Sequence, residues 1–127
     1  EEEDQEILMD TQLNQSAIYT AGYTFSGARS VRDGEVLSLA GYDFQVFHTP
    51  GHSRGGCCYY VASEHVLFSG DTLFQNSVGR TDFPTGSDVK MRKSIKKLFA
   101  LEKDYIVLPG HGLQTRLSYE RVSNPYA

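Results

Sequence analysis

Three short stretches of the chain are the most informative: HTPGHSRGG at residues 48–56, SGDTLF at residues 69–74 and LPGHG at residues 108–112. Each stretch lies at the end of an apolar, strand-like run and places one candidate metal ligand beside glycine, namely His52, Asp71 and His111. Two imidazoles and a carboxylate are ligands that zinc, iron and manganese take in proteins. Glycine lets the backbone turn sharply enough to direct these side chains at one point. The sequence therefore predicts that the three residues converge on a metal site.

Each of these residues has an ordinary explanation when it is taken alone. A lone histidine is more often structural or solvated than a metal ligand. Asp71 follows glycine and is well placed to cap a turn, while His111 lies between two glycines, as an exposed loop residue often does. The metal interpretation depends on all three occurring together, in order, each at the end of a strand-like run.

The other two histidines, His48 and His65, lack this context. His48 shares a predicted strand face with Phe44 and Val46, so packing or a hydrogen bond to a ligand is its expected role. His65 begins a strand and has no partner motif. Neither residue belongs to the predicted set of metal ligands.

Length and composition predict one soluble, globular domain over residues 1–127. The chain is 39% hydrophobic and 22% charged, which excludes a disordered or fibrous protein, and no apolar run is long enough to cross a bilayer. Five of the 16 acidic residues lie in the first six positions, so the rest is nearly neutral and gives no support to nucleic-acid binding. Cys57 and Cys58 are adjacent and point to opposite strand faces, so we expect reduced thiols and a cytoplasmic protein.

Hydrophobic spacing and turn residues predict a mixture of strands and helices. Asp33-Gly34 is a turn pair ahead of an alternating run, which favours a hairpin. Ser87 is placed to cap a helix whose apolar residues recur at helical spacing. The predicted elements are a helix at 2–14, a loop at 15–30, strands at 35–39, 44–48, 57–62, 65–69 and 105–108, a turn at 41–43, a polar stretch at 75–86, and helices at 87–101 and 116–122.

From about Val31 to the C-terminus the chain resembles the hydrolases of the metallo-β-lactamase superfamily, in particular their glyoxalase II-like branch. The three stretches above carry the resemblance, together with GRTDF at residues 79–83 and the helix that follows. It implies the α+β fold of that family, an αβ/βα sandwich. The family's first motif, H-x-H-x-D-H, does not occur in these 127 residues, so we expect a single partial domain whose front part is missing.

Two divalent metals lie side by side in that family, and the resemblance assigns a role to each matching residue. His52 completes the first metal site, Asp71 bridges both metals as the catalytic carboxylate, and His111 completes the second site. Zinc is the expected metal, with iron or manganese as alternatives. In the family the metals make a hydroxide available for attack on an acyl carbonyl and stabilise the oxyanion that forms.

Substrate contacts are expected from the loop that follows the bridging aspartate. Arg80 and Thr81 match positions that commonly touch substrate in the family, and a guanidinium there can pair with a carboxylate or phosphate. The alternative is that Arg80 only braces the loop through Asp82. Arg54, two residues past His52, is a second candidate for binding an anion. Glyoxalase II has a lysine and a tyrosine in this region, whereas this chain has GRTDFP, a departure that weakens the case for glutathione thioesters.

Three functions remain open from the sequence. The first is a metal-dependent hydrolase of small-molecule thioesters or esters, similar to hydroxyacylglutathione hydrolase, which is inactive as this truncated chain. The second is a persulfide dioxygenase-like oxidoreductase, whose group holds one iron with two histidines and an aspartate and shares a GRTDF-like segment. The third is a non-catalytic fragment that another chain completes. Because a sandwich without its front strands exposes apolar surface and strand edges, we also expect a homo-oligomer.

Overall fold

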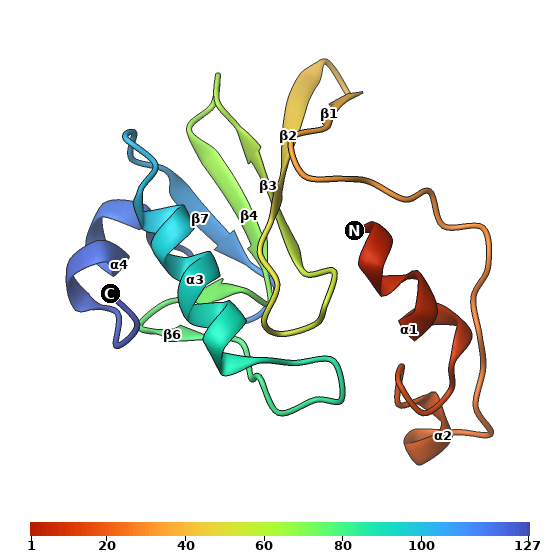
Figure 1. Ribbon diagram of the computed structural model, residues 1–127. Helices are drawn as coiled ribbons and strands as arrows, with labels where there is room; N and C mark the ends of the chain where they lie inside the picture. Colours follow the sequence, from red (N-terminus) through yellow and green to blue (C-terminus); the bar gives the residue numbers. More distant parts are fainter.

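The computed structural model describes residues 1–127 and is an α+β fold built on one six-stranded mixed sheet (Figure 1). In chain order the elements are η1 (Glu2–Asp4), α1 (Gln5–Met9), α2 (Ser16–Tyr19), β1 (Val36–Leu39), β2 (Tyr42–His48), β3 (Cys57–Val61), β4 (Val66–Gly70), β5 (Leu73–Phe74), β6 (Ser77–Val78), α3 (Asp88–Phe99), β7 (Ile106–Pro109), β8 (Thr115–Arg116) and α4 (Leu117–Ser123). The large sheet has the strand order β1-β2-β3-β4-β7-β8, while β5 and β6 form a separate hairpin. No helix in the structure has both the length and the apolar character needed to span a bilayer.

Strands β1 to β4 form an antiparallel meander, as their alternating sequence predicts. The first hairpin turns at Ala40 and Gly41, whose φ angles are 51° and 82°. Positive φ at both central residues is the geometry of a type I′ turn, whose twist matches that of the flanking strands. The predicted turn at 41–43 is therefore displaced, since Tyr42 and Asp43 already pair with β1.

Strands β4 and β7 run parallel and bring distant parts of the chain together. Val66 lies opposite Ile106, and Phe68 lies opposite Leu108. Parallel strands end at the same edge of a sheet, which is where such sheets form their binding sites. The loops that follow β4 and β7, and that carry two of the predicted ligands, are therefore neighbours.

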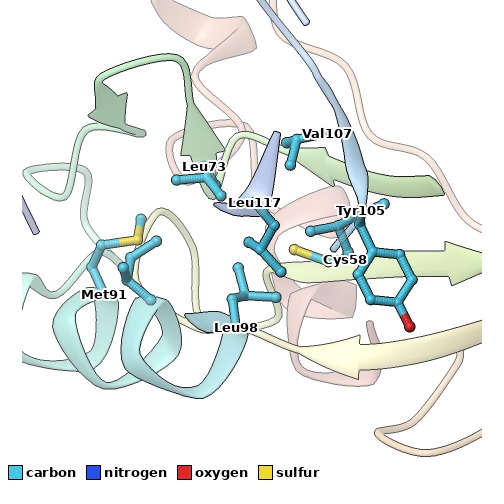
Figure 2. Close-up of a cluster of buried hydrophobic side chains, with 9 residues drawn as sticks. Cys58, Leu73, Met91, Leu98, Tyr105, Val107 and Leu117 are labelled. Carbon is cyan, nitrogen blue, oxygen red and sulfur yellow. The ribbon is translucent and has the colours of Figure 1, made fainter. Parts of the chain in front are cut away.

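The hydrophobic core lies between α3 and one face of the sheet (Figure 2). Helix α3 begins where the sequence predicts, since the Ser87 hydroxyl accepts a hydrogen bond from the Lys90 amide at 3.3 Å. Burial raises the pKa of the Cys58 thiol to about 11, so this cysteine stays protonated and acts as a small apolar residue. The nine buried residues of the core are Cys58, Leu67, Leu73, Met91, Ile95, Leu98, Tyr105, Val107 and Leu117.

The predicted N-terminal helix at 2–14 is wrong in its length. The helical part ends at Met9, because the Asp10 carboxylate accepts hydrogen bonds from the backbone amides of Gln12 and Leu13 at 2.8 and 3.1 Å. Such local side-chain bonds offer the backbone an alternative to the helix. The predicted loop at 15–30 is also wrong at its start, where helix α2 lies.

Two further strand pairs were not predicted. The β5–β6 hairpin reaches into the polar stretch at 75–86, and β8 pairs with β7 ahead of the last helix. Strands β5, β6 and β8 have only two residues each, which is too few to show an alternating pattern.

The second face of the sheet is also apolar. Paired residues of neighbouring strands share a face, so the strand registers place the following residues together: Leu37, Leu39, Tyr42, Phe44, Val46, Tyr59, Val61, Val66, Phe68, Ile106 and Leu108. A hollow of 270 Å³ on this face is lined by six hydrophobic residues and Glu64. A wetted sheet face normally carries polar residues, so this face has the composition of a covered one.

Self-association is the expected consequence, since another copy supplies the matching apolar surface in a solution of the purified chain. We predict a dimer or larger species in sedimentation velocity at micromolar concentration. Phe68→Lys places a charge on this face, where Phe68 is 39% exposed, and is expected to weaken the association. Val122→Lys, at a position on α4 that is 85% exposed, is the matched control. A wild-type chain that stays monomeric and unfolds cooperatively would contradict the prediction.

Candidate metal centre

Three side chains from separate loops meet at one edge of the sheet. The Nε2 atom of His52 lies 3.4 Å from Oδ2 of Asp71, and the Nε2 atom of His111 lies 3.4 Å from Oδ1 of the same carboxylate. The side chains remain accessible, with exposed fractions of 25% for His52, 32% for Asp71 and 76% for His111. The predicted convergence of the three residues is confirmed, whereas their use as metal ligands stays a prediction.

The spacing of these atoms suits metal ligation better than direct hydrogen bonding. A charge-assisted N–H···O bond is about 2.7–2.9 Å long, so 3.4 Å is too far for a strong one. Two ligands bound to one tetrahedral zinc ion, each at about 2.0–2.1 Å, are themselves about 3.4 Å apart. The distance between each Nε2 atom and its carboxylate oxygen is therefore the distance expected between two ligands of the same ion. Because the imidazoles face different oxygens, the donor set fits two ions that share Asp71.

A backbone contact selects the tautomer of the neutral His52 ring. Its Nδ1 atom lies 2.8 Å from the carbonyl oxygen of Arg80, and a carbonyl can only accept a hydrogen bond. Nδ1 of the neutral ring therefore carries the proton, and the lone pair on Nε2 is directed toward Asp71. A second hydrogen bond of this kind commonly orients histidine ligands of metals.

Buried hydroxyls tie the loops together beneath the site. Thr49, in the loop of the first histidine, and Thr72, beside the aspartate, bring their Oγ1 atoms within 2.9 Å of each other. Ser94 on α3 donates to the carbonyl oxygen of Pro50 at 2.8 Å. The two ligand loops are thus held by the core and by each other, as a preorganised site requires.

Gly110 leaves room for the carboxylate of Asp71. A Cβ atom at position 110 would clash with Oδ1 of Asp71. The Gly110 amide also donates to the carbonyl oxygen of Gly70 at 2.8 Å, which holds the two loops side by side. Glycine at this position therefore allows the loop of His111 to approach the carboxylate.

Gly110→Ala is expected to displace the carboxylate and to weaken zinc binding by about tenfold or more, the usual cost of misplacing a metal ligand. The free energy of unfolding should change by less than about 1 kcal/mol, because the displaced atom ends a partly exposed side chain. Equilibrium dialysis against Zn²⁺ and urea unfolding measure the two effects. Leu113→Ala, in the same loop at a position that is 71% exposed, is the control. Unchanged zinc affinity in Gly110→Ala would contradict this role of the glycine.

The two predicted anion-binding arginines are each held by a carboxylate. The Nε and Nη2 atoms of Arg80 donate to the two oxygens of Asp82, both at 2.7 Å, and the guanidinium lies 4.3 Å from the centre of the Phe83 ring. The Arg80 guanidinium lowers the pKa of Asp82 to about 2. Arg54 forms an ion pair with Glu6 at 3.1 Å. The bracing alternative for Arg80 is therefore the arrangement that the structure shows.

A cleft of 390 Å³ opens over the three converging residues. Two aromatic rings flank the imidazoles: the Phe83 ring centre is 5.4 Å from that of His52, and the Phe74 ring centre is 6.0 Å from that of His111. Thr81 does not line this cleft, so its contact with substrate stays a prediction. The lining residues are His52, Asp71, Phe74, Gly79, Arg80, Phe83 and His111. Neither phenylalanine was predicted as a site residue, although both lie inside the quoted motifs.

The remaining histidines face other groups. The Nε2 atom of His48 lies 3.1 Å from the carbonyl oxygen of Arg54, and the Nδ1 atom of His65 lies 3.3 Å from the carbonyl oxygen of Asp104. Both rings use a nitrogen on backbone carbonyls, and neither lines the cleft over Asp71.

The fold, and the residues at its edge, define a metallo-hydrolase-like α+β protein. The chain belongs to the metallo-beta-lactamase superfamily, whose profile matches residues 1–111. The resemblance inferred from the sequence motifs is thereby confirmed.

The known proteins to which this chain is similar are longer than the chain. Hydroxyacylglutathione hydrolase GloC of Haemophilus influenzae is 42% identical over 96 residues, which are 75% of this chain and 45% of that protein. The solved structure of the BLEG-1 B3 metallo-beta-lactamase is 40% identical with a TM-score of 0.84, over 97% of this chain and 61% of its own. TTHA1623, solved in a di-iron-bound form, is 35% identical with a TM-score of 0.83, over 98% of this chain and 62% of its own. The chain thus has the metallo-beta-lactamase fold in part and spans about half the length of the curated relatives it matches.

Proposed function

We propose that this chain contributes His52, Asp71 and His111 to the two-metal centre of a hydrolase that cleaves a small-molecule thioester or related ester. The observation that carries the proposal is that the two imidazoles face different oxygens of one carboxylate. A bridging carboxylate needs this arrangement, because each of its oxygens binds one cation. The likeness to hydroxyacylglutathione hydrolase GloC supports acyl-thioester chemistry. Zinc is the proposed metal, with iron or manganese as alternatives.

When bound, such metals supply Lewis acidity toward an acyl carbonyl and make water a better nucleophile near neutral pH. The residues of the chain prepare the site for that chemistry. The Arg80 carbonyl holds His52 in the tautomer whose Nε2 lone pair is free, and Asp71 supplies negative charge between the two imidazoles. Phe74 and Phe83 flank the imidazoles and give the cleft two apolar walls.

The chain alone is expected to hold metal weakly. Each ion gains one histidine and one oxygen of the shared carboxylate, whereas catalytic zinc usually takes about three protein ligands. Hydrolysis by this chain is therefore expected to be slow or absent, and fast turnover is expected where further ligands complete both ions.

Metal analysis after equilibrium dialysis tests the proposal. The chain is dialysed against Zn²⁺, Fe²⁺ or Mn²⁺, and hydrolysis of S-lactoylglutathione is followed by loss of the thioester. Binding that saturates at two ions per chain, and that falls in His52→Ala and His111→Ala but not in His65→Ala, is the expected result. Equal binding by all variants would contradict the ligand assignment. Tight retention of two ions by the wild-type chain would contradict the expectation of weak binding.

A single-iron oxidoreductase of the persulfide dioxygenase-like type is the second candidate. The observation that favours it is the chemical type of the donors, since two histidines and one carboxylate are ligands that one non-haem iron takes. One iron per chain, together with oxygen uptake in the presence of glutathione persulfide, would favour this function. Two zinc ions per chain and no oxygen uptake would favour the hydrolase.

A cytoplasmic location is part of the same proposal. Cys57 and Cys58 are both free thiols, and reduced cysteines are usual in a reducing compartment. Fractionation of cells that produce the protein, with immunodetection in each fraction, tests the location.

A further inference from the structure

The N-terminal segment is fastened to the loop of His52 through Asp4. The Ser53 hydroxyl donates to one oxygen of the Asp4 carboxylate at 2.6 Å, and the Gly55 amide donates to the other at 2.7 Å. A Cβ atom at position 55 would lie 2.6 Å from the backbone nitrogen of Asp4, so only glycine permits this approach. Both donors lie in the loop that carries the candidate ligand. The segment is therefore a fixed part of this side of the site.

This fastening creates a second cleft, of 320 Å³, between the N-terminal segment and the turn that follows Phe83. His52 and Phe83 line both this cleft and the cleft over Asp71. A molecule that reacts over the carboxylate can thus extend past the His52 ring into the second cleft. The lining residues are Ile7, Leu13, Asn14, Gln15, His52, Ser53, Phe83, Pro84 and Thr85.

The lining of the second cleft contains no carboxylate, ammonium or guanidinium group. The two neighbouring cations are already paired, Arg54 with Glu6 and Arg80 with Asp82. A carboxylate or phosphate in the cleft would lose its hydration without gaining a free cation, which is unfavourable. Ile7 offers an apolar contact, while amide and hydroxyl side chains on the rim offer hydrogen bonds.

We propose that the second cleft is a binding subsite for an uncharged acyl group that has an apolar body and a hydrogen-bonding end. Leu13 and Phe83 contact the body of that group, and the Gln15 amide and Thr85 hydroxyl bind its polar end. This assignment rests on the proposed function, because the acyl carbonyl is taken to lie over the carboxylate of the candidate metal centre. It makes the N-terminal segment a determinant of substrate choice.

A matched pair of probes tests the subsite in the metal-free, ¹⁵N-labelled chain. The probes are S-glutaryl-N-acetylcysteamine, whose acyl group ends in a carboxylate, and its terminal amide, which has nearly the same shape and no charge. The amide is expected to shift the backbone resonances of Leu13, Gln15 and Thr85 saturably and to bind about fivefold or more tightly than the acid, since the cleft leaves a carboxylate unpaired. Equal binding of the two probes, tighter binding of the acid, or shifts confined to other residues would each overturn the proposal.

Two substitutions test whether the amide probe binds in the second cleft. Leu13→Asp places a charge in the cleft and is expected to weaken binding of the amide probe by about tenfold or more. Asp4→Ala removes the hydrogen bonds that hold the N-terminal segment against the loop of His52. It is expected to weaken binding of the amide probe by about fivefold, the cost of losing these charge-assisted hydrogen bonds. Glu6→Gln, which breaks only the exposed pair with Arg54, is the control and should leave amide binding unchanged. A dispersed spectrum shows that each variant is folded, and undiminished binding in both test variants would contradict the subsite.

Failure of the subsite and failure of the proposed function give different results. The probe titrations use no metal and no turnover, so a chain without metal binding or hydrolysis can still show the preference for the amide. A chain that binds two zinc ions through the predicted ligands but does not distinguish the probes would retain the proposed function and lose the subsite.

Discussion

Replacing Asp71 with alanine is expected to abolish zinc binding at both proposed positions, because this one side chain faces both imidazoles. Loss of a group that merely orients a ligand costs about 10–100-fold in metal affinity. Loss of the shared ligand should therefore cost more than about 100-fold for each ion. The fold should be unaffected, since the Asp71 side chain is 32% exposed and faces the open cleft over the two histidines. Equilibrium dialysis at millimolar Zn²⁺ and thermal unfolding measure the two quantities.

Two further variants show whether the loss of zinc binding is specific to the carboxylate of Asp71. Asp71→Asn retains one oxygen, so it is expected to lose at least one of the two ions. Asp43→Asn removes a carboxylate of the first hairpin, where the aspartate accepts from the Ser38 hydroxyl at 2.6 Å, and should leave zinc binding unchanged. Retention of two ions by Asp71→Ala would contradict the bridging role.

Replacing Glu120 with alanine is expected to lower the free energy of unfolding by about 3 kcal/mol, the usual cost of breaking a buried, charged hydrogen-bond network. Glu120 is fully buried. One carboxylate oxygen accepts a hydrogen bond from the Thr115 hydroxyl at 2.6 Å. The other accepts from the backbone N–H of Asn76 and from the side-chain NH₂ of Asn124, both at 2.9 Å. Alanine would leave all three donors without this acceptor. Urea unfolding monitored by circular dichroism measures the loss.

The hydrogen bonds of Glu120 also help to hold the hairpin that forms one side of the cleft over Asp71. Asn76 lies in the turn of the β5–β6 hairpin, and the same hairpin carries Phe74 beside His111. Glu120→Gln keeps one acceptor oxygen and should fall between wild type and alanine. Glu102→Ala, at an exposed position, should change stability by less than about 0.5 kcal/mol. A Glu120→Ala variant as stable as the Glu102→Ala control would show that the network contributes little.

Features that depend on neighbouring residues could be predicted from the sequence. The β3–β4 hairpin follows from two apolar, strand-like runs that are joined by Ser63 and Glu64. Helix α3 follows from a capping Ser87 and apolar residues at helical spacing. The convergence of His52, Asp71 and His111 followed from their positions at strand ends together with the resemblance to a family whose sheets bring these loops together.

Features that depend on distant contacts could not be predicted. The bond between Asp4 and Ser53 joins residues that are 49 positions apart, and no local pattern marks either as a partner. Glu120 looks like an exposed helical residue, and nothing in the local sequence predicts its contact with the turn at Asn76, 44 positions earlier. Arg80 was assigned to substrate or to bracing with equal reason, since the choice depends on the rotamer that pairs it with Asp82. Tertiary packing decides each of these cases.

Anomalous diffraction from crystals of the chain soaked in millimolar Zn²⁺ locates bound ions even where binding is weak. The proposed centre predicts two peaks at the Asp71 carboxylate, each at a bonding distance of about 2.0–2.2 Å from a different oxygen. One peak should lie beside Nε2 of His52 and the other beside Nε2 of His111. A single peak bound by all three residues, or no peak at Asp71 beside peaks elsewhere on the chain, would contradict the bridged two-metal centre.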